Sequence, residues 1–318
     1  MGANLSIIIV NFNTGAYLVR CVESVFRIGK GDAWEIWVVD NGSTDGSAAQ
    51  VRERFSEIHF IGNDKNLGFA KANNQALGAA RGEYLLLLNP DTIAQEEAIE
   101  RLVGFMDSHP EAGVAGGQLL NSNGTRQNSI ANFPSLATEL LNKSLLRKFF
   151  PKKFPGKERT YHEPVEVDSV IGACMMVRRK AMEQTGLLDE GYFLFLEETD
   201  WCYRMKRAGW KVYYVPKAEI IHFQGRSARK DKRRAKLEYY RSRYHFFKKN
   251  RGRVQWFLLF MGLMIKLSFE LAFTGLICVF TLLAFGKSRR RLSILVYLMR
   301  WHLRGCPEGM GLKGINGQ

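Results

Sequence analysis

The feature that most limits the fold is the alternation of short apolar runs with helical patterns over the first 120 residues. Each apolar run is nearly continuous in Ile, Val, Leu or aromatic residues, as in strands that are buried on both faces. Strands that alternate with helices indicate βαβ units and a mostly parallel sheet. The predicted strands are residues 5–10, 35–39, 58–61 and 84–88, and the predicted helices are residues 17–27, 47–55 and 70–80.

The chain from residue 121 to residue 166 has no clean periodicity and is rich in Asn, Ser, Pro and Lys. We expect this stretch to contain a mobile loop over the functional site of the protein. Regular structure is predicted again over residues 167–177, followed by a short helix from Arg179, a helix over 201–208 that ends at Gly209, and a strand over 211–215. A second apolar run, residues 218–222, ends at His222.

The positive charge is concentrated in one part of the chain. The formal charge is +15, from 46 Lys and Arg against 31 Asp and Glu. Residues 1–225 sum to −2 and residues 226–318 to +17, with a basic, aromatic-rich segment over 226–253 and an apolar segment over 254–285. We therefore predict a catalytic domain over residues 1–225 and a basic, helical, membrane-associating region over residues 226–318.

The apolar segment over 254–285 exceeds the roughly 20 residues that a membrane span needs. Lys266 and Glu270 interrupt it, and both flanks are basic, so a single span would place one basic flank outside. The pattern favours two shallow helices or a re-entrant hairpin, with Lys266 and Glu270 paired near the apex; a single span and a soluble partner helix are the alternatives. With no signal-peptide pattern at the N-terminus and five scattered cysteines, the expected location is the cytoplasmic face of the cell membrane.

Polar residues follow the predicted strands, where ligands bind in open α/β sheets. Asn11, Asp40, Asn89 and Asp91 occupy such positions. Asp40 could accept hydrogen bonds from a base or ribose, or cap the next helix, which is the role we expect for Asp45. Asp91 could bind Mg²⁺ or Mn²⁺ together with a diphosphate, or end a proline-centred turn as a helix cap.

Three carboxylates and one imidazole are further candidates. Glu197, Glu198 and Asp200 lie within four residues after an aromatic and aliphatic stretch, where like charges and apolar walls raise a carboxyl pKa toward that of a general base. The alternative is an acidic first turn that suits the helix dipole. His222 could bind a divalent metal, although a lone histidine is more often structural.

These blocks, in this order and spacing, resemble the inverting family 2 glycosyltransferases of the GT-A fold, particularly the bacterial rhamnosyltransferase-like branch that builds cell-surface polysaccharides. The resemblance covers residues 5 to about 227. The matching stretches are residues 6–13, 38–47, 66–74, 89–92, 172–179 and 197–202, and His222. The implied fold is α/β, a mostly parallel central sheet flanked by helices.

The resemblance implies a role for each matching residue. Glu198 corresponds to the catalytic base, with Glu197 and Asp200 as alternatives because the usual Glu-Asp pair is Glu197-Glu198 here. Asp91 and His222 correspond to metal ligands, and Asn89 stands in the place of the first aspartate of the metal-binding Asp-x-Asp element. The implied donor-binding residues are Asn11, Asn13, Asp40, Asn66, Gly68, Asn73, Asn89, Gly172 and Ala173.

The implied reaction is a single displacement that inverts the anomeric carbon, assisted by Mg²⁺ or Mn²⁺. The favoured donor is dTDP-rhamnose, with UDP- and GDP-sugars as alternatives. The expected acceptor is a polyprenyl-diphosphate-linked saccharide, with a soluble glycan as the alternative.

Two other classes compete with this interpretation. A nucleotidyltransferase that makes a sugar nucleotide would use similar aspartates, but it would carry a glycine- and arginine-rich loop after the first strand, where this chain has residues 11–15. A non-enzymatic protein could bind nucleic acid through residues 226–253. Because that segment adjoins an apolar stretch, the sequence favours an anionic membrane surface as partner and no nucleic acid.

Overall fold

The computed structural model describes residues 4–28, 34–151, 154, 160–224, 231–282 and 284–315. The chain forms two compact units. The first contains Met1–Phe133, Pro155–Tyr192 and Glu197–Ser227, and the second contains Pro134–Phe154, Phe193–Leu196 and Ala228–Gln318. The sequence-based division after residue 225 therefore differs from the observed one in two internal segments, residues 134–154 and 193–196, which group with the C-terminal part.

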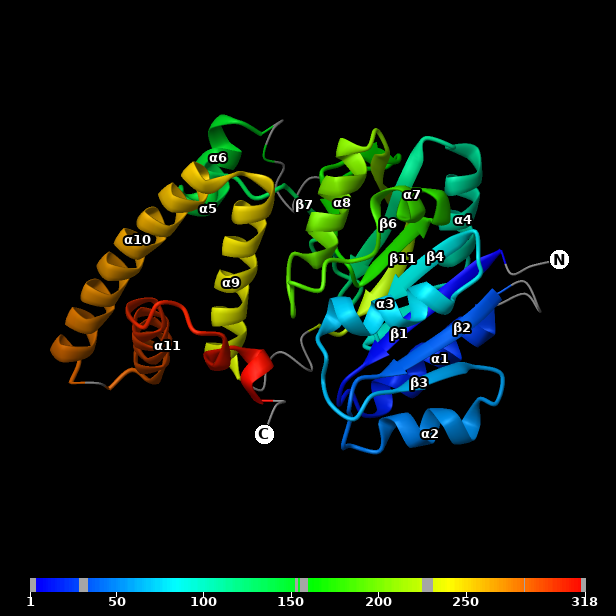
Figure 1. The fold of residues 1–318 in the computed structure, drawn as a ribbon, viewed down its shortest axis with the longest axis horizontal. Coiled ribbons are helices and arrows are strands. Elements are labelled where there is room, and N and C mark those ends of the chain that lie inside the picture. The colour runs from blue at the N-terminus through cyan, green and yellow to red at the C-terminus, as the bar shows by residue number, and fades with distance from the viewer. Residues whose placement is uncertain are drawn as a thin grey trace. The chain divides into compact units, whose positions relative to one another are not determined.

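The first unit is built on a mixed sheet (Figure 1). Its strand order is β3-β2-β1-β4-β10-β6-β11-β5, with β8 paired to β11. The strands β3, β2, β1 and β4 are parallel, as are β6 and β11, whereas β10 runs antiparallel between β4 and β6. The strands are β1 (Leu5–Asn11), β2 (Trp34–Asp40), β3 (His59–Gly62), β4 (Tyr84–Leu88), β5 (Thr92–Ala94), β6 (Ala112–Leu120), β7 (Ile130–Ala131), β8 (Val165–Glu166), β9 (Ser169–Val170), β10 (Cys174–Arg178) and β11 (Lys211–His222).

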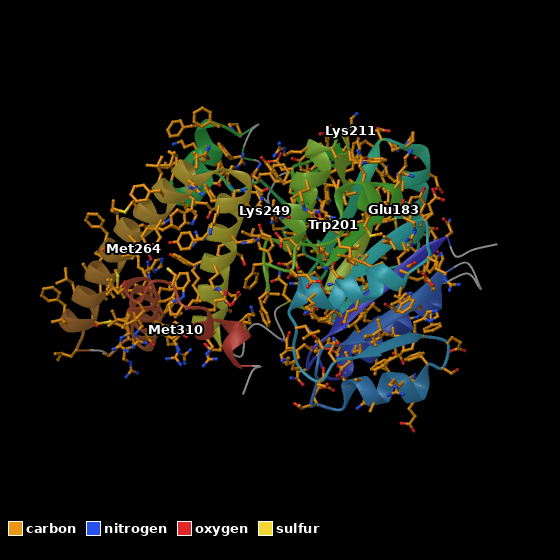
Figure 2. The ribbon with its side chains drawn as sticks, viewed as in Figure 1. Glu183, Trp201, Lys211, Lys249, Met264 and Met310 are labelled. Carbon is orange, nitrogen blue, oxygen red and sulfur yellow. The ribbon has the colours of Figure 1, made fainter. Side chains whose placement is uncertain are left out.

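Helices cover both faces of this sheet. Alternate residues of β1 point to opposite sides, so Ile7 and Ile9 pack with one helix layer and Ile8 with the other. Trp201, fully buried, anchors the second layer (Figure 2). The first layer contains α1 (Ala16–Ile28) and α4 (Ala98–Ser108), and the second contains α3 (Phe69–Ala79), α7 (Arg179–Thr185) and α8 (Glu197–Arg207). The helix α2 (Ser47–Arg54) packs on α1.

Two strands differ from the sequence prediction. The strand β3 was expected to be buried on both faces. It lies instead at one end of the strand order, next to β2, and its first residue, His59, is exposed. The fully buried strand β6 was not predicted, because three glycines weaken its apolar pattern. Those glycines make room for neighbours: a Cβ on Gly116 would lie 2.5 Å from Val170 Cβ, and one on Gly117 would lie 2.5 Å from the Ala218 carbonyl oxygen.

The strand β11 joins two runs that were predicted separately. Pro216 lies inside it, where the pairing with β6 shifts register between Val215 and Glu219, so the missing proline N–H falls at an irregularity. In the stretch expected to be a mobile loop, the structure has two short helices, α5 (Leu136–Leu140) and α6 (Lys143–Phe149), as well as β7 and β8. Residues 152, 153 and 155–159 of that stretch lie outside the described residues.

The second unit is helical. Its main helices are α9 (Lys232–Asn250), α10 (Arg253–Phe280) and α11 (Gly286–Leu303), followed by short 3₁₀ helices at Glu308–Met310 and Leu312–Ile315. The predicted break near Lys266 and Glu270 was wrong, because α10 is continuous through both residues. The two charges lie one turn apart on one helix face, and Glu270 pairs with Arg291 of α11 at 3.3 Å.

One helix of the described chain, α10, is long and apolar enough to cross a membrane by length and composition. All five cysteines are free. Cys21, Cys174, Cys202 and Cys278 are buried, and Cys306 is half-buried.

Candidate active site

Asn11 and Asp40 stand side by side at the carboxyl ends of β1 and β2, where they are register partners. Asn11 Nδ2 donates to Asp40 Oδ1 at 2.9 Å and to Ser47 Oγ at 2.8 Å, and Asn11 Oδ1 accepts from the Thr14 hydroxyl at 2.6 Å. The Ser43 N–H donates to Asp40 Oδ2 at 3.1 Å. The pair therefore fixes the two loops that follow these strands.

Asn13 belongs to the same group of loops. It adopts a left-handed backbone with φ 53°, and its Oδ1 accepts from the Thr44 N–H at 2.8 Å. Asp45 does not cap α2 as predicted, because the N-cap position is Gly46. Its carboxylate instead accepts hydrogen bonds from the N–H and the hydroxyl of Ser47, the first residue of α2.

The loop before α3 is held by an asparagine that the sequence did not single out. Asn41 Nδ2 donates to Asn66 Oδ1 at 2.8 Å, and the Leu67 N–H donates to Asn41 Oδ1 at 2.9 Å. Gly68, with φ +89°, donates its N–H to Asn66 Oδ1 and precedes α3. Asn73 is not brought into this group: it is 1% exposed, and its Nδ2 bonds to the Phe69 carbonyl inside α3.

A carboxylate and an imidazole lie close together near the carboxyl end of β4. His222 Nε2 lies 3.4 Å from Asp91 Oδ1, and Asn89 Nδ2 lies 3.5 Å from the same nitrogen. These side chains come from the end of β4, the turn into β5 and the end of β11. The antiparallel pairing of β5 with β11, in which His222 is opposite Thr92, brings the two sequence regions together.

Gln127 orients this histidine, and sequence reasoning missed it. His222 Nδ1 lies 3.1 Å from Gln127 Oε1, and Gln127 Nε2 donates to the His222 carbonyl at 2.5 Å. Gln127 Oε1 can only accept, so Nδ1 carries the proton, and in the neutral imidazole the lone pair is then on Nε2. A glutamine in an irregular segment has no pattern that marks such a role.

The residues present fit a divalent cation. In the neutral imidazole, the Nε2 lone pair and the Asp91 carboxylate are both electron-rich, both side chains are buried, and Nε2 lies 3.4 Å from Asp91 Oδ1. In the part of the chain that the structure describes, no three His, Cys, Asp or Glu side chains form a metal-binding group. The protein would thus supply two ligands, with the others left to a bound substrate and water.

The turn at residues 171–174 connects Asn89 to Glu198. The Asn89 N–H donates to the Ala173 carbonyl at 3.0 Å. A Cβ on Gly172 would lie 3.4 Å from Glu198 Cβ and 3.9 Å from its carboxyl carbon, so the glycine packs on the acid side chain. A continuous series of neighbouring residues thus links the imidazole to the acid side chain, in the order Asp91, His222, Asn89, Ala173, Gly172 and Glu198.

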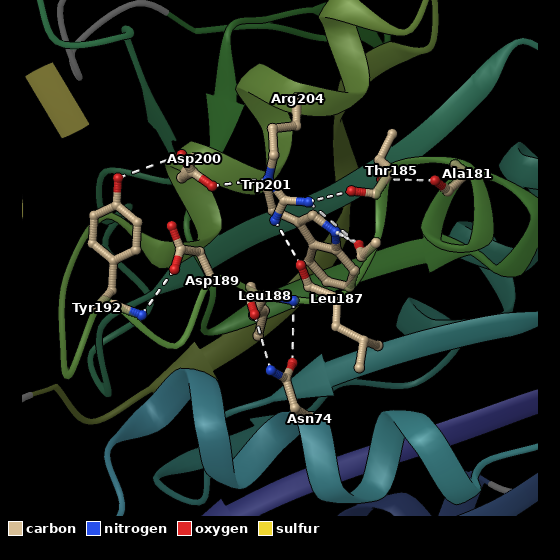
Figure 3. A network of polar contacts seen from close by, with 12 residues as sticks. Asn74, Ala181, Thr185, Leu187, Leu188, Asp189, Tyr192, Asp200, Trp201 and Arg204 are labelled. Carbon is tan, nitrogen blue, oxygen red and sulfur yellow. Dashed lines mark hydrogen bonds and ion pairs between the residues drawn. The ribbon is translucent and has the colours of Figure 1, made fainter. Parts of the chain in front are cut away.

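The three carboxylates of the first turn of α8 differ in their surroundings. Asp200 is fully buried in an ion pair, with its Oδ2 accepting from Arg204 Nε at 2.9 Å, and Arg204 is held in turn by the Leu187 carbonyl (Figure 3). Glu197 is also buried, with 4% exposure. Glu198 Oε2 is enclosed and has no hydrogen-bond partner among the described residues.

Desolvation raises the pKa of the Glu198 carboxyl above its ordinary value, and backbone N–H groups at the start of α8 oppose this only in part. A carboxyl group with a raised pKa and an enclosed oxygen that accepts no hydrogen bond from the described residues is suited to taking a proton from a substrate hydroxyl. Asp200 is held by Arg204, so the geometry favours Glu198 over Asp200 for that role.

Comparisons with known proteins agree with this geometry. The family described as "Glycosyl transferase family 2" matches residues 6–186, more than half of the chain. The chain is 28% identical over 257 residues to the N-acetylglucosaminyl-diphospho-decaprenol L-rhamnosyltransferase of Mycobacterium tuberculosis, covering 76% of this chain and 83% of that protein. It is 26% identical over 225 residues to the rhamnosyltransferase WbbL of Escherichia coli, covering 68% and 82%.

Among solved structures, the fold is similar to a mannosyltransferase from Pyrobaculum calidifontis in complex with GDP-Man and Mn²⁺. The TM-score is 0.57 at 14% identity, and the match covers 96% of this chain and 87% of that one. This likeness supports the GT-A type of fold predicted from the sequence. The chain belongs to glycosyltransferase family 2 and is a glycosyltransferase.

Proposed function

We propose that this enzyme transfers a sugar, with L-rhamnose from dTDP-rhamnose favoured over hexoses from UDP- or GDP-sugars, to a saccharide on a polyprenyl diphosphate. The names of the M. tuberculosis and E. coli relatives support both the sugar and the lipid-linked acceptor. The observation that carries the proposal is the series of contacts that joins the unsatisfied Glu198 carboxyl group to Asp91 and His222.

Asn11, Asn13 and Asp40 would hold the loops that bind the nucleoside. The hydrogen bond from Asn11 to Asp40 and the one from the Thr44 N–H to Asn13 join the loops at the ends of β1 and β2. Asn66 and Gly68 would shape the neighbouring wall. Asn73 acts from inside α3, on the packing of that helix, and Asn89, Gly172 and Ala173 would line the sugar side.

In the proposed reaction, the acceptor hydroxyl attacks the anomeric carbon from the side opposite the nucleotide diphosphate. Glu198 takes the hydroxyl proton as the new bond forms, and the anomeric centre inverts. Asp91 and His222 would hold Mg²⁺ or Mn²⁺, which when bound supplies positive charge for the departing nucleotide diphosphate. Gln127 keeps the proton on His222 Nδ1, so that Nε2 remains available.

The second unit would attach the enzyme to the cytoplasmic face of the membrane. Exposed apolar residues run along α10, and basic residues precede and follow this helix. Apolar surface flanked by lysine and arginine favours an anionic membrane as the partner, over nucleic acid.

The proposed role of Glu198 is tested with the E198Q variant. Loss of a general base lowers kcat by roughly 10²- to 10⁴-fold, while binding of the donor stays within about twofold because glutamine keeps the shape of the side chain. The measurement is initial rates of transfer, with donor binding by calorimetry. The control is E183Q, an exposed acid on α7. Near-normal turnover by E198Q would reassign the base to Glu197.

A further inference from the structure

A cavity of about 820 Å³ lies among α9, α10 and α11 of the second unit. Each helix contributes one face to its lining, at the spacing that places residues above one another on a helix. The face of α9 carries Lys232 and Lys236, that of α10 carries Lys266, and that of α11 carries Lys287 and Arg290.

The charges around this cavity are unbalanced. Arg243, which also lines it, is buried and paired with Glu139 at 2.9 Å, and the lining acid Glu270 is paired with Arg291. The five cations just named have no ion-pair partner among the described residues. The pKa of Lys236 is lowered, first by desolvation and then by the nearby Arg243, and these effects outweigh the opposing effects of Glu270 and Glu139.

The beginning of α11 adds to the positive potential. Gly286 is the first residue of this 18-residue helix, and the residue before it, Phe285, provides no side-chain hydrogen bond to the first turn. The first N–H groups of a helix have no partner within the helix, and they carry the positive end of its dipole. Gly286 and Lys287 both line the cavity, so the N-terminal end of α11 lies at its wall.

The cavity also has apolar lining, and α10 carries an exposed apolar surface. Leu263, Leu295 and Leu298 line the cavity. Along α10, on which Figure 2 labels Met264, Ile265, Phe269 and other apolar side chains are exposed. A ligand for such a cavity carries concentrated negative charge next to an apolar chain, which describes a phosphorylated lipid better than a nucleic acid or a free ion.

We propose that this cavity binds the diphosphate of the lipid-linked acceptor, with the first part of the lipid chain against α10. This inference rests on the proposed function and adds to it a site for the acceptor outside the sheet. Five cations without an ion-pair partner in the described part of the chain, together with a helix N-terminus, suit a diphosphate, which carries at least two negative charges on adjacent phosphates, better than the single charge of most phospholipid headgroups.

The test removes two exposed cations of α11 in the full-length K287Q/R290Q variant. The control is K248Q/R304Q, which removes two exposed charges of the same unit outside the cavity lining. Transfer is measured in neutral detergent with one saccharide on two carriers, a polyprenyl diphosphate and an uncharged alkyl glycoside. We expect the KM for the diphosphate carrier to rise about tenfold or more in the first variant alone, with kcat and the KM for the alkyl glycoside unchanged.

An unchanged KM for the diphosphate carrier, or an equal rise for the neutral carrier or in the control, overturns the inference while the wild-type transfer still supports the proposed function. Loss of binding to phosphatidylglycerol vesicles without any change in KM assigns the cavity to phospholipid and also overturns it.

A direct measurement separates the two proposals. Calorimetry with farnesyl diphosphate in the same detergent should show binding to the wild type and about tenfold weaker binding to K287Q/R290Q. If the wild type transfers sugar to no lipid-linked acceptor, the proposed function fails. The binding measurement then tests the cavity by itself. Weaker binding of farnesyl diphosphate to K287Q/R290Q supports a lipid diphosphate site, and equal binding overturns the inference.

Discussion

At the scale of single residues, Glu198 determines how activity should depend on pH. A general base must be deprotonated to act, so activity rises as the pH rises through its pKa. Burial raises that pKa above the ordinary carboxyl value of about 4.3. We therefore expect the acidic limb of the kcat profile to lie clearly above pH 4.3 in the wild type and to be absent from the residual activity of E198Q. A limb at the ordinary carboxyl value would contradict the enclosed position of this side chain.

Gln127 should matter through His222. In Q127A the imidazole loses the acceptor that keeps the proton on Nδ1, so Nε2 carries the proton in part of the molecules. Affinity for Mn²⁺ should fall by roughly 10- to 100-fold, measured from the free Mn²⁺ signal in electron paramagnetic resonance. The control is Q184A, which removes a surface hydrogen bond to Trp210. Equal Mn²⁺ affinity in Q127A and the wild type would show that His222 does not bind the metal.

The residues of the site differ in how well they can be predicted from the sequence. Asp40, Asp91 and Glu198 stand within a few residues of the end of an apolar run, and that position marks them as candidates. Asn41 and Gln127 act through side-chain amides whose partners at the site, Asn66 and His222, are far away in the chain. Their roles depend on tertiary contacts, and no local pattern carries that information.

At the scale of elements, the glycines of β6 explain why a central strand was missed. Gly116 faces Val170 so closely that a methyl group would lie 2.5 Å from the valine Cβ. We expect G116A to lose about 1–3 kcal/mol of unfolding free energy through overpacking. The matched control is G104A within α4, where a Cβ meets nothing within 4 Å and alanine should add up to about 1 kcal/mol. Urea denaturation measures both changes, and equal effects would rule out close packing as the cause.

The apolar pattern predicts elements well where the side chains themselves make the core. The strands β1 and β4 and the helices α1 and α3 are found close to their expected bounds. The apolar pattern fails for β6, because its glycines leave room for neighbouring side chains instead of contributing apolar side chains of their own. It also fails for α10, where two charges suggested a break. A helix tolerates such charges when they share one face that contacts polar groups, as Glu270 does with Arg291.

At the scale of the whole molecule, charge and exposed apolar surface belong to the second unit. Phe269 and Phe273 of α10 are 73% and 64% exposed. If this surface enters a membrane, F269S/F273S should lose about 3 kcal/mol of transfer free energy, roughly a hundredfold in partition to vesicles of anionic phospholipid. Flotation of the full chain with vesicles measures this, with L187S in the first unit as control. Unchanged flotation would assign attachment to the basic residues alone.

The half-buried Cys306 offers a site for selective labelling of the protein with a spectroscopic probe. Burial raises the thiol pKa of Cys21, Cys174 and Cys202 to about 12, and Cys278 is also buried, so a maleimide reagent at neutral pH should react first at Cys306. A fluorophore there would mark the second unit without removal of any native cysteine. Paired with one introduced cysteine on the first unit, it would report in real time how the separation of the two units changes as donor and acceptor are added.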